Sequence, residues 1–268
     1  MDHEALKQHQ RRIWSRGDYA AVSDALRPAA VALCDACAVS AGQEVLDVAA
    51  GDGNFAIACA YEGASVVASD ISPGMVERGR ARAQAEGYDI EWVEADAEDL
   101  PFEDERFECA GSVFGAMIAP RPEVAARELF RVVRPGNTVG MTAWTPESLM
   151  ADYFAITRSY APPEPDERPS STEWGREEVV RERFDGLAAS IEFERRTLTW
   201  EAESAEALTA RYGLAAPPMD AAREAMPPER FEAMVAEITD LFRRRAGGGD
   251  GPLALEAEYA LIVARRRG

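Results

Sequence analysis

A glycine turn follows a short apolar run near residue 50. Residues 45–54 read VLDVAAGDGN, and Gly51 and Gly53 allow the backbone to turn tightly or to approach a ligand closely. We expect a helix to begin at Asn54, and the free N–H groups at a helix N-terminus attract negative ligand atoms. These residues therefore predict a site for a nucleotide-like ligand.

A carboxylate lies 19 residues beyond the first of these glycines. Asp70 ends the next predicted strand, where an acid can accept hydrogen bonds from both hydroxyls of a ribose. Gly51-x-Gly53-x-x-Ala56 also fits the fingerprint of dinucleotide-binding folds. An NAD-dependent oxidoreductase is thus one open interpretation, but it gives no role to Asp47 or to residues 94–102.

Asp47 precedes the glycines within the end of the first predicted strand. In this order the segment resembles motif I of the class I S-adenosylmethionine (SAM)-dependent methyltransferases, whose pattern is acid-x-Gly-x-Gly-x-Gly. The matching residues are Asp47, Ala49, Gly51 and Gly53, so Ala49 replaces the first glycine. Because alanine adds only a methyl group, we expect the turn to tolerate this departure.

Later segments resemble further motifs of the same family in the same order. Residues 69–75 (SDISPGM) resemble the second motif, which implies that Asp70 holds the ribose, Ile71 packs on adenine and Met75 contacts the cofactor. Residues 94–102 (EADAEDLPF) resemble the third. There the resemblance implies that Asp96 meets the adenine amino group and that the Ala97 N–H meets a ring nitrogen.

Residues 107–120 resemble the strand and turn that face the ligand in this family, which implies that Ser112 and Phe114 contact the cofactor. Residues 14–19 (WSRGDY) resemble an N-terminal segment of a menaquinone-type and secondary-metabolite branch, where it caps the methionine end of SAM. Tyr19 would then contact the cofactor. Packing of Trp14 and Tyr19 against the first helix is the alternative.

An apolar loop, residues 112–120, leaves the fourth predicted strand. It suits a flat or hydrophobic methyl acceptor, because ligand pockets are mostly apolar with few polar contacts. Large aromatic residues more often fill cores, and core packing is the alternative for every candidate acceptor contact. The candidate acceptor contacts are Trp14, Met117, Trp144, Trp174 and Tyr212.

No catalytic residue is assigned. The two histidines, His3 and His9, lie near the N-terminus, so a histidine base requires that segment to fold over the pocket. Other candidates for proton transfer are Tyr19, Asp152, Tyr153 and Tyr212.

The elements that must position these residues alternate between strands and helices. This alternation predicts a parallel sheet covered by helices. Strands are expected at 44–48, 64–69, 90–93, 107–113 and 138–144, and helices at 54–62, 72–86 and 123–133. With the resemblance, the predicted fold is an α/β, doubly wound, seven-stranded, mostly parallel sheet. Residues 191–200 and 254–264 would form its sixth strand and its antiparallel seventh strand.

Four segments follow from this interpretation. Residues 1–40 form an N-terminal helical cap, and 41–147 form the SAM-binding core. Residues 148–253 form a helical lid with the sixth strand, and 254–268 form the last strand of the sheet. Within the lid we expect a proline-rich loop at 161–170 and helices broken near the proline pairs 217–218 and 227–228.

Composition restricts the partners. A formal net charge of -19 does not supply the cationic field that nucleic-acid binding needs, so no nucleic-acid partner is predicted. Cys34 and Cys37 form a C-x-x-C without a second ligand pair, so no metal is predicted. Lys7, the only lysine, suggests no mechanism. Without a secretory apolar region or a run of roughly 18 apolar residues, we expect a cytoplasmic protein with no membrane partner.

The predicted function is transfer of a methyl group from SAM to an oxygen, nitrogen or carbon of a small, hydrophobic or aromatic molecule, leaving S-adenosylhomocysteine (SAH). The displacement is in line, so the protein must align the acceptor and exclude water. A module that binds SAM without catalysis is a further alternative, and a closed cavity beside the methyl group would distinguish the enzyme. Oligomeric state stays open.

Overall fold

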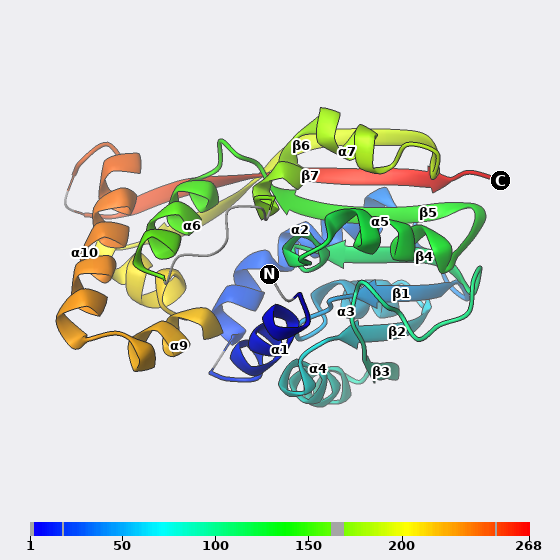
Figure 1. The fold of residues 1–268 in the computed structure, drawn as a ribbon, viewed down its shortest axis with the longest axis horizontal. Helices are drawn as coiled ribbons and strands as arrows, with labels where there is room; N and C mark the ends of the chain where they lie inside the picture. Colours follow the sequence, from blue (N-terminus) through cyan, green and yellow to red (C-terminus); the bar gives the residue numbers. More distant parts are fainter. Residues whose placement is uncertain (1–2, 18, 162–168, 250) are drawn as a thin grey trace.

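The computed structural model describes residues 3–17, 19–161, 169–249 and 251–268. Its centre is a seven-stranded sheet of order β3-β2-β1-β4-β5-β7-β6 (Figure 1). The strands are β1 (Glu44–Val48), β2 (Ser65–Asp70), β3 (Ile90–Glu94), β4 (Phe107–Val113), β5 (Val133–Trp144), β6 (Ala188–Ala202) and β7 (Leu253–Arg266).

Strands β3, β2, β1, β4 and β5 pair in parallel, and β7 is antiparallel to both β5 and β6. Strands β1, β2 and β4 are buried along nearly their whole length, as expected where helices cover both faces of a parallel sheet. The predicted fold class is confirmed, including the antiparallel seventh strand.

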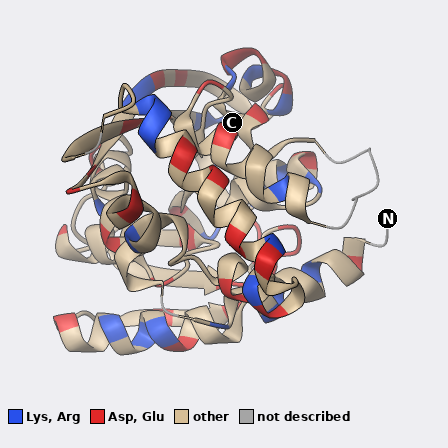
Figure 2. Cartoon of the chain, turned by 90° about the vertical axis from the view of Figure 1, so that its left-hand side faces the viewer, with Lys and Arg blue, Asp and Glu red and all other residues tan. Residues whose placement is uncertain are grey.

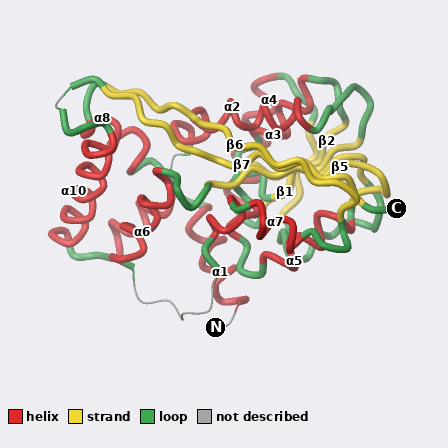
Figure 3. Tube along the Cα trace, turned by 90° about the horizontal axis from the view of Figure 1, so that it is seen from above, coloured by secondary structure: helices red, strands yellow, loops and turns green. Residues whose placement is uncertain are grey.

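Helices cover the two faces of this sheet, as Figure 3 shows. Helices α2 (Ala20–Ala36), α3 (Asn54–Tyr61) and α4 (Pro73–Glu86) lie on one face. Helices α5 (Pro122–Arg131) and α7 (Glu177–Arg183) lie on the other, with α1 (His3–Trp14) near the same side. After β3 the chain returns to the middle of the sheet, so the strand order reverses between the neighbouring strands β1 and β4. Open α/β sheets bind ligands beyond the strand ends at such a point.

Local sequence signals explain where α4 begins and ends. Ser72 caps the helix by accepting a hydrogen bond from the Met75 N–H, and Pro73 occupies the first helical position, where a missing N–H costs nothing. Gly87 ends the helix in a left-handed conformation. The fifth strand differs from prediction because it begins at Val133. Residues 134–137, which fall between the helix and the strand predicted from the sequence, lie within β5 at a register shift against β4.

The last two strands are longer than predicted. They extend beyond the core and carry the lid helices at their far ends (Figure 3). Prolines begin two lid helices, as the breaks in the sequence pattern indicated. The lid helices at these far ends are α6 (Leu149–Tyr160), α8 (Ala205–Leu208), η3 (Thr209–Gly213), α9 (Pro217–Ala225) and α10 (Pro228–Arg245), whereas η2 (Ser171–Gly175) of the same predicted segment packs against β5 and α7. Most of the predicted 161–170 loop lies outside the described residues.

The four cysteines are free and buried. The thiol of Cys34 forms a hydrogen bond with the thiol of Cys59, and the thiol of Cys37 forms one with Cys109. The two members of the C-x-x-C therefore have different partners. Among the described residues, no group of histidine, cysteine or acidic side chains is arranged to hold a metal ion. No helix in the described parts of the chain is long and apolar enough to cross a bilayer.

Candidate active site

One cavity of about 870 Å³ extends from the carboxyl ends of the central strands into the lid. Its walls come from α1, from the turns after β1, β2, β3 and β4, and from α6, η3, α9 and α10. Figure 1 shows α1 at the boundary between the sheet and these lid helices. The cavity thus lies where the doubly wound topology predicts a ligand site.

The glycine turn has an unusual backbone. Ala49, Gly51 and Gly53 all have positive φ, of 53°, 58° and 93°. At Gly53 an added Cβ would also come within 2.7 Å of the Trp92 ring, so this position requires glycine. Ala49 lies in the left-handed region that costs an L-residue about 1–2 kcal/mol, so this replacement is less neutral than expected. Its methyl and carbonyl fill the space that a Gly115 side chain would need.

The carboxylate of Asp47 is buried at the end of β1. Its Oδ2 accepts a hydrogen bond from the Ala56 N–H at 2.9 Å, which anchors the first turn of α3. Its Oδ1 is buried without a hydrogen-bond partner among the described residues, and Asp47 is one of the residues that line the cavity. Burial raises the pKa of Asp47 well above its usual range, against the Ala56 bond, which lowers it.

Asp70 connects the glycine turn to the start of α4. Its Oδ2 accepts from the Gly51 N–H at 2.9 Å and its Oδ1 from the Ser72 N–H at 2.8 Å. Each carboxylate oxygen retains a further lone pair for a ligand hydroxyl. Burial raises the pKa of Asp70 to about 6, although the two N–H groups and the nearby Arg78 favour the ionised form.

Asp96 belongs to an ionic cluster that sequence reasoning missed. Lys7 of α1 lies 2.5 Å from Asp96 Oδ2 and 2.6 Å from Glu98 Oε2. The Glu98 N–H donates to Asp96 Oδ1 at 2.9 Å, and Arg121 donates to the buried Glu98 carboxylate. Burial alone lowers the pKa of Lys7, but the bonds to both acids outweigh it and raise the pKa. Burial likewise opposes ionisation of Glu98, and Lys7 with Arg121 brings its pKa below the usual range.

The N-terminal helix folds over the cavity. Gln10 donates to the Ile118 carbonyl at 3.2 Å, and Arg78 of α4 donates to the Trp14 carbonyl at 2.6 Å. The rings of Trp14 and Tyr19 meet edge to face, 5.7 Å apart at 88°. Both residues also line the cavity, so the two interpretations of this segment are compatible.

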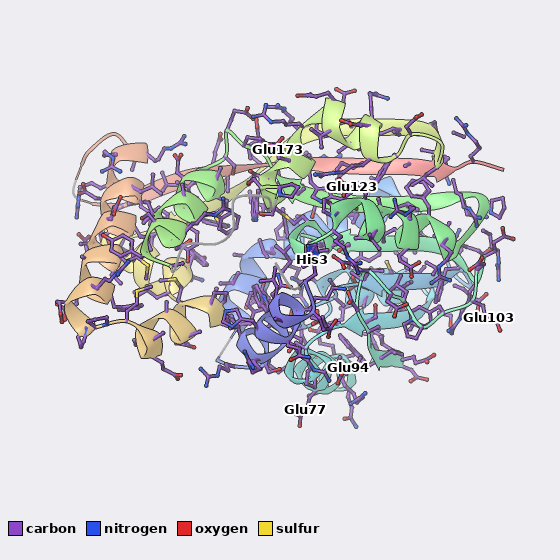
Figure 4. All side chains as sticks on the ribbon, viewed as in Figure 1. His3, Glu77, Glu94, Glu103, Glu123 and Glu173 are labelled. Atoms are coloured by element: carbon purple, nitrogen blue, oxygen red, sulfur yellow. The ribbon has the colours of Figure 1, made fainter. Side chains whose placement is uncertain are left out.

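This placement bears on the histidines. Both are exposed, and His9 also lines the rim of the cavity, whereas His3 lies at the start of α1, away from the lining (Figure 4). Asp152 instead pairs with Arg245 at 2.5 Å, outside the cavity, and is withdrawn as a candidate for proton transfer. The Tyr153 hydroxyl donates to the Gly213 carbonyl at 2.8 Å, and burial raises its pKa, so it is a poor base.

The lid end of the cavity is aromatic and rich in methionine. Phe114 stacks on Trp144 with ring centroids 4.0 Å apart, and Trp200 lies between Trp144 and Tyr212. Six of the eight methionines line the cavity as a whole, Met75 of α4 at the cofactor end and the other five farther along it, and their flexible thioethers suit an irregular apolar ligand. These methionines are Met75, Met117, Met150, Met219, Met226 and Met234.

Most predicted contacts border the cavity, and three do not. Ser112 lies behind the wall, where it donates to the Val48 carbonyl and accepts from the Ala116 N–H. Gly53 caps α3, one residue away from the lining. Trp174 corrects a prediction: it packs in the core against Phe184, beneath the guanidinium of Arg183, and not at the cavity. The predicted residues that do line the cavity are Trp14, Tyr19, Asp47, Ala49, Gly51, Asp70, Ile71, Met75, Asp96, Ala97, Phe114, Met117, Trp144 and Tyr212.

The doubly wound sheet, the glycine turn and the acids at successive strand ends define a nucleotide-binding α/β enzyme fold. A family model described as "Methyltransferase domain" matches residues 45–136, which carry this turn and these acids. The chain belongs to the class I SAM-dependent methyltransferases.

Relatives match this chain over different lengths. An uncharacterized protein of Mycobacterium tuberculosis is 35% identical over 272 residues, covering 99% of this chain and 97% of that protein. A demethylmenaquinone methyltransferase of Clavibacter sepedonicus is 43% identical over 109 residues, covering 41% of this chain and 44% of that protein. The crystal structure of the YcgJ protein from Bacillus subtilis shares the fold, with a TM-score of 0.61, 19% identity and coverage of 89% of this chain and 98% of that chain.

Proposed function

We propose that this methyltransferase acts on a small, flat, hydrophobic or aromatic molecule. The observation that carries the proposal is the continuity of one cavity from the glycine turn to an aromatic and methionine-lined lid. Its volume of about 870 Å³ lies in the upper part of the range of about 300–1,000 Å³ for ligand pockets. This volume supports simultaneous binding of a cofactor and an acceptor.

The residues at the strand ends fit SAM. Asp70 would accept the ribose hydroxyls, and Asp96 with the Ala97 N–H would bind the adenine edge. The positive-φ turn brings backbone close to the ligand, and beside it Asp47 has a buried Oδ1 whose acceptor capacity no described residue uses. The remaining proposed cofactor contacts are Tyr19, Ala49, Gly51, Ile71, Met75 and Phe114.

Bound SAM supplies an electrophilic methyl group on a good leaving group. The task of the protein is therefore to align the acceptor atom and to exclude water, with α1 and the lid as the covering elements. Proposed acceptor contacts are Trp14, Met117, Trp144 and Tyr212. An acceptor that must lose a proton could use His9, the histidine that lines the cavity.

A small-molecule acceptor is supported by two further observations. The relative from Clavibacter sepedonicus is by its name a demethylmenaquinone methyltransferase, although the match covers less than half of each chain. Acidic and basic residues are interspersed over the face shown in Figure 2, and the net charge of -19 disfavours nucleic acid. We retain the division into cap, core and lid, and a cytoplasmic location, as parts of this proposal.

Neither alternative gains a specific observation. Nothing in the comparisons favours a dehydrogenase, and that interpretation still leaves Asp47 and Asp96 without a role. A module that binds SAM without catalysis does not require the apolar chamber beyond the cofactor end.

The direct test has two stages. Calorimetric titration with SAM, SAH and NAD should give binding of both adenosyl ligands and none of NAD. Incubation with methyl-labelled SAM and a panel of phenols, hydroquinones and planar heterocycles should then label one structural class. Binding of NAD without SAH would overturn the cofactor assignment. Binding of SAH with labelling confined to charged aliphatic amines would overturn the acceptor class.

A further inference from the structure

Two cations on one face of α1 meet three acids at the end of β3 and directly after it. Lys7 and Arg11 are four residues apart, so they lie on the same side of the helix. Lys7 pairs with Asp96 and Glu98, and Arg11 pairs with Glu94, which is labelled in Figure 4. The adenine-binding segment is thus fastened to α1.

The two halves of this contact differ in burial. The side chains of Arg11 and Glu94 are 47% and 39% exposed, so water and salt screen their attraction. The side chain of Lys7 is 7% exposed and that of Glu98 is fully buried. A buried charge that loses its partner is strongly unfavourable, so the Lys7 half holds the segment in place.

Lys7 also restricts the orientation of Asp96. This carboxylate is 26% exposed and would be free to rotate if it lacked partners. The Glu98 N–H holds Oδ1 and the Lys7 ammonium holds Oδ2, so both ends of the carboxylate are fixed. Each oxygen still has a second lone pair for an N–H of a ligand.

We propose that Lys7 is a positioning residue for adenine recognition, which holds Asp96 in the orientation that selects a 6-amino purine and closes α1 over the cofactor. The inference rests on the proposed binding of adenine by Asp96. It assigns a role to the only lysine of the chain. Helix α1 adds His9, Gln10, Ile13 and Trp14 to the cavity wall, so the same contact that orients Asp96 also covers the ligand.

The test compares SAH with S-inosylhomocysteine, in which an oxygen replaces the 6-amino group. Wild-type protein should prefer SAH. Lys7→Gln should weaken SAH binding about tenfold more than it weakens binding of the inosyl ligand, a difference of about 1.4 kcal/mol, because loss of α1 closure affects both ligands alike. Lys7→Arg should restore most of the preference. Arg12→Gln, at an exposed position on the same helix, is the matched control and should bind both ligands like wild type.

The outcomes separate this inference from the proposed function. Wild-type affinity for SAH in Lys7→Gln, or an equal loss for both ligands, would overturn the positioning role while leaving the cofactor assignment intact. Failure of wild-type protein to bind SAH, or to prefer it over the inosyl ligand, would overturn the proposed cofactor site itself.

A second measurement needs no variant, in case Lys7→Gln does not fold. An amine-reactive acylating reagent can modify Lys7 and the N-terminal amine, which serves as an internal reference for peptide mass spectrometry. If modification requires α1 to open and the open form does not bind SAH, then SAH at 100 times its Kd should slow Lys7 labelling by roughly a hundredfold. An unchanged ratio of the two labelling rates would show that α1 does not close over the ligand.

Discussion

The two ends of the cavity have walls of different chemistry. At the cofactor end, carboxylates are held by backbone N–H groups at fixed distances, as with Asp70 between Gly51 and Ser72. At the lid end, the wall is built from aromatic rings and methionines. Directional hydrogen bonds require particular residues at particular spacings, whereas an apolar surface of the right shape can be built from many sequences. The first end therefore carries motifs and the second carries none.

The largest expected effect is a loss of stability on substitution of Trp174, which tests whether this residue packs in the core or lines the cavity. Trp174→Ala should lower the free energy of unfolding by about 3–5 kcal/mol, because it empties a buried aromatic site. SAH affinity should stay at the wild-type value. Denaturant unfolding and calorimetry measure the two quantities. Trp174→Phe is the matched variant and should cost much less, since it keeps an aromatic ring and removes an indole N–H that has no partner in the described structure.

Trp174→Ala protein that keeps its stability but loses acceptor methylation would return Trp174 to the acceptor site. It would also contradict the proposed distinction between residues of this segment that contact the ligand and residues that only pack in the core.

The next effect concerns the cofactor end. Asp70→Ala should raise the Kd for SAH at least about a hundredfold, because each hydrogen bond to a charged group is worth about 1.5–3 kcal/mol and the ribose offers two hydroxyls. Asp89→Ala, at an exposed position before β3, should bind SAH normally and controls for the loss of one negative charge. Equal affinities in the two variants would remove Asp70 from the ribose site.

The pKa of Asp70 predicts a smaller, pH-dependent effect. Since burial raises this pKa to about 6, the carboxylate gains a proton as pH falls through 6 and loses acceptor capacity. At pH 5, one unit below this pKa, about a tenth of the Asp70 carboxylate is ionised. SAH affinity should therefore fall about tenfold between pH 7.5 and pH 5. The unliganded protein should respond oppositely. A raised carboxyl pKa means that the folded state binds the proton more tightly, so this group contributes more stability as pH falls toward 4.

Calorimetry and denaturant unfolding across this pH range would show both trends. Asp70→Asn should bind SAH weakly at every pH and should lack this component of the pH dependence. A wild-type Kd that does not change between pH 7.5 and pH 5 would contradict the assignment.

The smallest effect concerns the backbone of the turn. Ala49→Gly should raise the free energy of unfolding by up to about 1 kcal/mol, because relief of a left-handed alanine slightly exceeds the entropy cost of glycine. The opposite substitution at the other end of the turn, Gly53→Ala, should destabilise the protein by about 1–3 kcal/mol, because the added Cβ would overlap the Trp92 ring. Denaturant unfolding of both variants measures these values. A loss of stability in Ala49→Gly would show that the methyl group contributes packing that outweighs its strain.

Sequence reasoning located the cofactor end because its signals are local. The strand, the glycine turn and the capped helix at Ser72 lie within thirty residues of one another, and each obeys a rule about backbone geometry. It did not find the role of Lys7, whose partners are about ninety residues away and become neighbours only when α1 crosses the strand ends. The available signal was a single lysine in an arginine-rich chain. Its spacing of four residues from Arg11 places both cations on one face of the predicted helix, which indicates an acidic partner.

The sequence by itself determined the fold class, the family and the positive-φ glycine turn, because period, glycine placement and capping act over short distances along the chain. Only the tertiary structure decided which aromatic residues face the cavity. Trp144 and Trp174 look alike in sequence, yet one stacks on Phe114 at the cavity wall and the other fills the core beside Phe184. That distinction depends on how η2 packs against β5 and α7, which involves contacts between residues far apart in the chain.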